Sequence, residues 1–449
     1  MTATTTTTTG QTPDSQGKES FFAANRNIWL IPLIFSITAS WIQAPALIVS
    51  AEVAYTWGWQ GLLWFAVPNG IVLVFFAPFA KRIRERLPFG FTLSDYMRRT
   101  YGERVHKVYL FQLTVVAVCV FAAQMLAGGV LISYITGMNY LTVCALLSIG
   151  TLAYSSFGGL RASVAADFFH IGATIITIFL FAPIMVNMIG LDTVLTGMSS
   201  AHVDSIELAL TYGIPTAVGL MTGAFGDQSL WQRSFATRIQ HLRKAFTASG
   251  LFFFLVPMST GMLGFVASGS GMELDNPQLA NIMAVNELMP TWAVIPFTIM
   301  VVGALASTMD NCLVSISTLM GHDLTTKGNP LRRGRIAGAV AAVVGMGIAS
   351  IPGLTLIHLW LMYATLRAAT FGPTVLTFIR NDWRPSARGI YIGVPASLAI
   401  AMPLFIYGSF VPEAGMLKTV GSVLVVVISV TLAIVLKDRK ETTAKEPTA

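Results

Sequence analysis

Residues 28–51 read IWLIPLIFSITASWIQAPALIVSA, and this stretch decides the fold. It is long enough to cross a bilayer, which takes about 20 apolar residues in a helix. Its centre carries four polar side chains: Ser36, Thr38, Ser40 and Gln43. Pro45 lacks an amide hydrogen and clashes with the carbonyl of Trp41, four residues back. The stretch therefore indicates either the broken helix of a transporter or a proline-kinked structural helix.

The composition is that of a polytopic membrane protein. Of 449 residues, 54% are hydrophobic and 11% are charged, whereas soluble domains carry about 25% charged residues. The net charge of +7 does not indicate nucleic-acid binding, because the charges lie between apolar runs. Three cysteines lie inside such runs, which indicates packing rather than metal ligation: Cys119, Cys144 and Cys312. With no histidine cluster, Ser-His-Asp set or phosphate loop, we predict that the chain is not an enzyme.

The hydropathy pattern predicts about twelve membrane-spanning segments. They cover roughly 28–51, 60–80, 108–136, 139–157, 162–189, 208–231, 245–269, 291–321, 335–352, 354–379, 389–410 and 416–436. If the N-terminus is cytoplasmic, all but two of the 28 Lys and Arg fall on the inner side. The exceptions are Arg367 and Lys418. This positive-inside pattern predicts a cell-membrane protein, in the plasma or inner membrane, with both termini cytoplasmic.

Two of these segments are interrupted near their middles. The first is broken at Pro45, and the sixth contains Gly219, Gly223 and Gly226. An inverted repeat of five helices plus five would place the two broken helices face to face. We therefore expect a disordered cytoplasmic tail over 1–27, a ten-helix core over 28–380 with repeats at about 28–189 and 208–380, two further helices over 381–436, and a cytoplasmic tail over 437–449.

The eighth segment carries oxygen-bearing side chains on one helix face. The residues at i, i+3, i+4 and i+7 are Ala304, Ser307, Thr308 and Asn311. Hydroxyls on one face are typical of a site for a hard cation. They can also bond the carbonyl four residues back, so the pattern alone leaves both readings open.

Ionisable residues inside membrane segments are costly, at about 2.5–3.5 kcal/mol for an acid, and indicate function. The acids are Asp167, Asp227 and Asp310. Asp227 either contributes to the solute site or pairs with Arg233 or Arg238 as an inner gate. Arg367 either meets a substrate carboxylate or pairs with an acid for structure.

Several motifs together resemble the solute:sodium symporter family, from about Asn25 to Lys437. They are TASWIQAP (38–45), YSSFGGLRASVAADFFH (154–170), GALASTMDNCLVSIS (303–317) followed by Asp323, and FGP (371–373). Four shorter pieces are most similar to its high-affinity urea-transporter branch: RNI (26–28), VAYTWG (53–58), DFFH (167–170) and DQSLWQR (227–233).

The resemblance implies an all-α LeuT-type fold of two inverted five-helix repeats, with Na+ as the coupling ion. It implies sodium ligands from the carbonyls of Ala39, Ile42 and Ala304 and the hydroxyls of Ser307 and Thr308. Asp167, Asp310 and Asn311 are expected to form a second cation site or an ion exit path. The residues expected to contact the solute are Trp41, Gln43, Asp227, Gln228, Thr365 and Arg367.

The sequence therefore predicts a sodium-coupled symporter that imports a small polar solute by alternating access, with a urea-like amide favoured. The alternatives are a sodium symporter of an amino acid, sugar or monocarboxylate, and an uncoupled channel or facilitator. The expected partners are the solute, sodium and the lipid bilayer, without nucleic acid. The sequence leaves the oligomeric state open.

Overall fold

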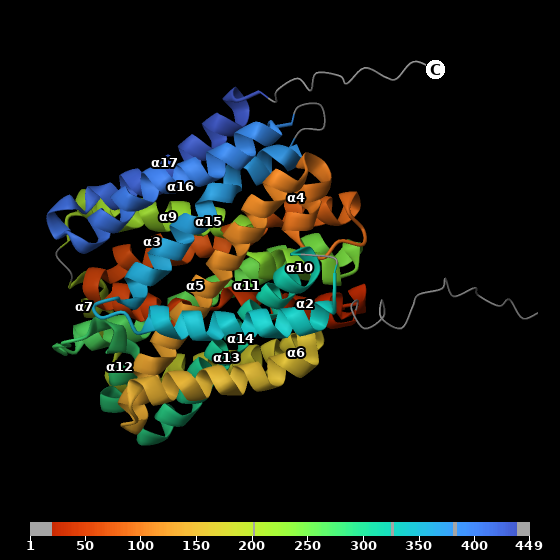
Figure 1. The fold of residues 1–449 in the computed structure, drawn as a ribbon. Coiled ribbons are helices and arrows are strands. Elements are labelled where there is room, and N and C mark those ends of the chain that lie inside the picture. The colour runs from red at the N-terminus through yellow and green to blue at the C-terminus, as the bar shows by residue number, and fades with distance from the viewer. Residues whose placement is uncertain (1–19, 201–202, 325–326, 380–383, 438–449) are drawn as a thin grey trace, which may run out of the picture.

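The computed structural model is a bundle of helices (Figure 1). It describes residues 20–200, 203–324, 327–379 and 384–437, apart from the side chains of residues 44–45, 154, 156–159, 161–162, 182 and 186. The α-helices are α2 (Leu30–Trp41), α3 (Ala44–Arg86), α4 (Leu93–Tyr101), α5 (Glu103–Thr136), α6 (Tyr140–Ile184), α7 (Leu191–Ser199), α8 (Ser205–Leu208), α9 (Ile214–Gly223), α10 (Gln228–Ala236), α11 (Ile239–Gly269), α12 (Ala280–Leu288), α13 (Val294–Thr318), α14 (Pro330–Ala349), α15 (Leu356–Ile379), α16 (Ala387–Phe410) and α17 (Met416–Val435). Short 3-10 and π turns join them: η1 (Ala24–Arg26), η2 (Met185–Ile189), η3 (Ala209–Gly213), η4 (Ala224–Gly226), η5 (Pro277–Leu279), η6 (Thr291–Ala293), η7 (Leu319–Asp323) and η8 (Pro412–Ala414).

Among the described residues, 8 helical stretches are long and apolar enough to cross a membrane. They are Ala46–Arg86, Glu103–Thr136, Ser163–Phe181, Ser205–Gly226, Ile239–Gly269, Thr291–Asp323, Ala387–Phe410 and Met416–Val435. Helices also occupy the remaining predicted segments, namely α2, the first part of α6, α14 and α15. The predicted all-helical membrane fold is confirmed.

The first predicted break lies next to Pro45, as the missing amide hydrogen of proline predicts. Helix α2 ends at Trp41 and α3 begins at Ala44, with Pro45 in the first turn of α3. The amide of Gln43 donates to the carbonyl of Trp41 at 2.9 Å and so does not close a helical bond to Ala39. Helix α3 then continues to Arg86 through one non-helical residue, Gly58, at φ 60°.

The second break lies between α9 and α10, where glycines allow close packing. A Cβ on Gly219 would lie 2.7 Å from the Cβ of Ala364, and one on Gly226 would lie 2.8 Å from the Cα of Arg367. The chain is extended at Asp227, whose carboxylate accepts the amide of Ser229 at 2.9 Å and caps α10. Both broken helices therefore have a second half with its N-terminus buried in the bundle.

Two features shape the outside of the bundle. Helices α16 and α17 lie together along one edge, whereas α6, α13 and α14 lie toward the opposite side (Figure 1). Helices α3 and α11 pack closely because a Cβ on Gly250 would lie 2.6 Å from the carbonyl oxygen of Gly70, and one on Gly264 would lie 2.2 Å from that of Ala51.

Some predicted boundaries need correction. The predicted disordered tail over 1–27 is wrong for residues 20–27, because Phe22 is fully buried and its carbonyl accepts from Gln232 at 2.8 Å. The rest of that tail, and residues 438–449 of the predicted C-terminal tail, lie outside the described residues. The fourth predicted segment and most of the fifth form the single helix α6, and the fifth ends in η2. The early part of α6 packs on α14 through Tyr140 and its later part on α13 through Thr177.

Candidate ion and solute site

Two of the predicted sodium ligands, Ile42 and Thr308, meet where α13 passes the break between α2 and α3. Thr308 Oγ1 donates to the carbonyl oxygen of Ile42 at 3.5 Å. Oxygen ligands about 2.4 Å from a hard cation, at right angles to each other, lie about 3.4 Å apart. The spacing of this pair thus fits one edge of a coordination shell. All the predicted ligand residues are buried: Ala39, Ile42, Ala304, Ser307 and Thr308.

Asp167 on α6 joins three other helices at this point. Its Oδ1 accepts from Ser307 on α13 at 2.5 Å, and its Oδ2 accepts from Ser36 on α2 at 2.6 Å. The same Oδ2 accepts from Arg233 on α10 at 2.9 Å. Asp167 and Arg233 are 0% and 1% exposed in their side chains, so this is a fully buried ion pair.

Arg233 belongs to this buried network, where sequence reasoning did not place it. Its guanidinium donates to Asp167, to Asn311 Oδ1 at 2.7 Å, and to Ser36 Oγ at 2.8 Å. The prediction ended the sixth segment at residue 231 and counted Arg233 as a loop cation, whereas α10 continues to Ala236. The available signal was the motif DQSLWQR, which directly follows the glycines of the second break.

The second predicted cation group is only partly assembled. Asn311 Nδ2 lies 3.5 Å from Asp167 Oδ1, and its Oδ1 accepts from Ser163 at 2.5 Å. Asp310 is fully buried, and neither of its carboxyl oxygens has a hydrogen-bond partner among the described residues. The guanidinium of Arg233, rather than Asp310, therefore joins Asp167 to Asn311.

A cavity of about 20 Å³ lies beside this network, with room for about one water molecule. Its lining includes predicted residues from the sodium, second-cation and solute groups: Gln43, Asp227, Gln228, Thr308, Asn311 and Arg367. The fold thus brings together residues that lie far apart in the sequence.

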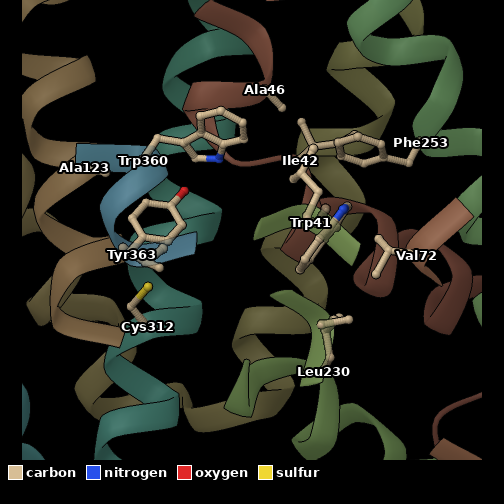
Figure 2. Close-up of a cluster of buried hydrophobic side chains, with 14 of the residues drawn as sticks. Trp41, Ile42, Ala46, Val72, Ala123, Leu230, Phe253, Cys312, Trp360 and Tyr363 are labelled. Carbon is tan, nitrogen blue, oxygen red and sulfur yellow. The ribbon is translucent and has the colours of Figure 1, made fainter. Parts of the chain in front are cut away.

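Arg367 pairs with an acid at the edge of this cavity. Its Nη2 donates to Asp227 Oδ2 at 2.6 Å, so the prediction that Asp227 pairs with Arg233 or Arg238 is wrong. Its guanidinium carbon lies 4.8 Å from the ring centre of Tyr363 and 5.7 Å from that of Trp41. The hydroxyl of Tyr363 donates to Gln43 Oε1 at 2.6 Å. Figure 2 shows Tyr363 on α15 to the left of Trp41, the last residue of α2.

Three predicted solute residues are engaged elsewhere. Thr365 Oγ1 lies 3.4 Å from Ser422 Oγ on α17 and does not line the cavity. The indole of Trp41 donates to Asn69 at 3.0 Å. Gln228 lines the cavity, but its amide donates to the carbonyl of Phe91 at 3.1 Å and accepts from the amide of Leu93 at 3.2 Å.

The segment that Gln228 holds is also anchored by Asp323, the last residue of η7, which follows α13. Asp323 Oδ2 accepts from Thr92 at 2.6 Å and also from Ser94. His106 Nε2 lies 3.1 Å from the carbonyl oxygen of Asp323. The second half of the broken helix is thus tied, through residues 91–94, to the end of η7.

The comparison with family models decides the identity. The model of the sodium:solute symporter family matches residues 21–379. The chain belongs to the sodium:solute symporter family. The predicted resemblance is therefore confirmed, and the family consists of transporters rather than enzymes.

Two curated relatives that match this chain are distant in sequence. The probable urea active transporter 1 of Schizosaccharomyces pombe is 24% identical over 284 residues, which cover 57% of this chain and 41% of the relative. The urea-proton symporter DUR3 of Oryza sativa subsp. japonica is 24% identical over 375 residues, which cover 75% of this chain and 52% of the relative. The chain thus spans about half the length of these relatives.

The fold of the chain is also that of solved transporters. A Na+-coupled sialic acid symporter, in a substrate-bound outward-open state, superposes with a TM-score of 0.71 at 13% identity. The match covers 92% of each chain. The predicted LeuT-type fold is confirmed, and the protein is a multi-pass membrane protein.

Proposed function

We propose that this chain is a sodium-coupled symporter that imports a small polar solute, with a urea-like amide favoured. The observation that carries the proposal is the meeting of Thr308 with the carbonyl of Ile42, directly beside a polar cavity. A cation bound there would tie α13 to the broken helix. Because a ligand shifts a conformational equilibrium by its differential affinity, sodium would favour the state in which the two are joined.

The charges around the cavity favour a neutral solute over an acid. Arg367 is already neutralised by Asp227, so a carboxylate would have to displace that partner. Neutral side chains that can donate and accept hydrogen bonds line the cavity, as recognition of an amide requires: Gln43, Ser229, Thr308 and Asn311. Both relatives described above are named as transporters of urea, which supports the same choice of solute.

We further propose that only one sodium ion binds, at the Thr308 site. The guanidinium of Arg233 already donates to both Asp167 and Asn311, where a second cation would need their oxygens. Asp167 would then draw the departing sodium inward through its contact with Ser307. In this proposal the ion pair of Asp167 and Arg233 closes the inner side of the site.

The proposed location is the cell membrane, with both termini cytoplasmic. Three arginines at the same end of the bundle donate hydrogen bonds to backbone carbonyls at that end. The pairs are Arg26 with Gly90 at 2.8 Å, Arg82 with Phe378 at 3.0 Å, and Arg86 with Thr377 at 2.9 Å. The positive-inside rule places that end in the cytoplasm.

Uptake into proteoliposomes tests the function. Labelled urea, amino acids, sugars and short acids are offered separately under an inward sodium gradient, an inward proton gradient and no gradient. We expect accumulation of urea under the sodium gradient alone. Accumulation under the proton gradient alone would assign the coupling to protons, and equilibration without accumulation would identify a facilitator.

Removing one oxygen from the sodium site should weaken sodium binding. In Thr308→Ala and in Ser307→Ala we expect the half-saturating sodium concentration for uptake to rise at least several-fold, with folding intact. Thr298→Ala is the matched control, because that hydroxyl on the same helix bonds its own backbone at Val294. Unchanged sodium dependence in both site variants would remove this site from the mechanism.

Removing the amide at the break should weaken solute binding. A buried polar group left without its partner costs about 1–3 kcal/mol, so we expect Gln43→Ala to lower solute affinity by roughly 5- to 150-fold. The hydroxyl of Tyr363 would lose its acceptor in this variant. Thr365→Ala is the control, because Thr365 faces Ser422 instead of the cavity. Equal solute affinities of the two variants would contradict the role of Gln43.

A further inference from the structure

A groove runs along the membrane-facing side of the contact between α3 and α11, away from the transport site. It has a volume of about 780 Å³. One wall is a stripe of α3 at i, i+3, i+4 and i+7: Val67, Gly70, Ile71 and Val74. The other wall is a stripe of α11 that begins at Arg243 and Lys244 and ends at Leu251 and Phe254. We call this feature the α3–α11 groove.

Most of the α3–α11 groove is apolar and open to the membrane. Ile71 and Leu251 are 50% and 72% exposed, and Val74 is 44% exposed. At the floor of the groove the two helices lie close together, since a Cβ on Gly250 would lie 2.6 Å from the carbonyl oxygen of Gly70. An exposed apolar groove on a membrane protein is covered by lipid hydrocarbon, because removing apolar surface from water is favourable.

One end of the groove carries two cations. Arg243 and Lys244 are both exposed, and within the described part of the chain neither forms an ion pair. From Arg243 to Phe254, α11 rises by about 16 Å at 1.5 Å per residue. That length is about half of a hydrocarbon core roughly 30 Å thick, and therefore matches one leaflet.

We propose that the α3–α11 groove binds an anionic phospholipid, with an acyl chain along the groove and the headgroup phosphate at Arg243 and Lys244. The apolar walls suit a chain, and the paired cations suit a headgroup with a net negative charge rather than a zwitterion. This site would stabilise the contact between α3, which continues from the first break, and α11. It does not depend on which solute the protein carries.

Native mass spectrometry and thermal unfolding of the full chain in detergent test the proposal. Phosphatidylglycerol should remain bound to the parent and raise its midpoint of thermal unfolding, whereas phosphatidylcholine should do neither. Arg243→Gln with Lys244→Gln should weaken phosphatidylglycerol binding about 25-fold, at roughly fivefold per cation. Ala248→Phe, which fills the groove and keeps both charges, should also prevent binding.

The matched control is Lys107→Gln with Arg332→Gln, which removes the same charge from exposed positions outside the groove. This control should bind phosphatidylglycerol as the parent does. Three results would overturn the proposal: equal binding by the Arg243 and Lys244 variant and the control, equal stabilisation of the parent by phosphatidylcholine, or equal stabilisation by glycerol phosphate, which lacks acyl chains.

Discussion

Replacing Arg233 with methionine should lower the free energy of unfolding by about 3–5 kcal/mol, because it leaves Asp167 buried without its counter-ion. Asp167→Leu should cost a similar amount, since the guanidinium then loses its carboxylate. The double variant removes both charges and should regain most of the stability. Unfolding in mixed micelles of rising SDS content measures all three, and we expect sodium-driven uptake to be lost in each.

The control for this prediction is Lys81→Met. Lys81 and Glu85 form an exposed pair, with side chains 49% and 47% accessible, and the loss of such a pair changes stability by about 1 kcal/mol or less. If Arg233→Met unfolds as the parent does, or if the double variant is no more stable than the weaker single variant, the ion pair does not hold the site closed.

Breaking the pair of Arg367 and Asp227 should abolish solute uptake. Arg367→Gln leaves the carboxylate of Asp227 unpaired at the cavity, although the amide of Ser229 still donates to it. Losing one partner of a buried charge pair costs about 2–5 kcal/mol, so we expect urea uptake to fall roughly 30-fold or more. Asp227→Asn should have an effect of the same order.

The double variant, Arg367→Gln with Asp227→Asn, restores neutrality and should recover at least tenfold over either single variant. Uptake at matched surface expression is the measurement. A different result would show that Arg367 binds the carboxylate of an acidic substrate. In that case Asp227→Asn would increase uptake of a monocarboxylate. Arg367→Gln would abolish uptake of the acid, while uptake of urea would persist.

The sequence could predict the fold because its signals are local. Hydropathy and the position of Lys and Arg locate the membrane segments, and the missing amide of Pro45 locates the first break. The stripe at Ser307 and Thr308 predicts a helix face directed at the break, and the contact between Thr308 and Ile42 agrees with it.

The partners of buried charges could not be predicted, because they depend on which helices become neighbours. Asp227 meets Arg367, which lies 140 residues later, rather than Arg233, six residues away. Asp310 directly precedes Asn311 in the chain, yet neither of its carboxyl oxygens has a hydrogen-bond partner among the described residues. A shift of one residue along a helix turns a side chain by about 100°, and sequence spacing alone does not fix which side faces a neighbour.

The shell around Arg233 also has a consequence for the order in which the protein assembles. The hydrogen-bond partners of Arg233 come from both directions along the chain. Ser36 precedes it by 197 residues and Asp167 by 66 residues, whereas Asn311 follows it by 78 residues. Domains form from the N-terminal side during synthesis. When α10 emerges, α2 and α6 are already present, so the charge can be neutralised at once. Its last partner exists only after α13 has been made, and until then the second half of the broken helix lacks part of the structure that holds it in the membrane.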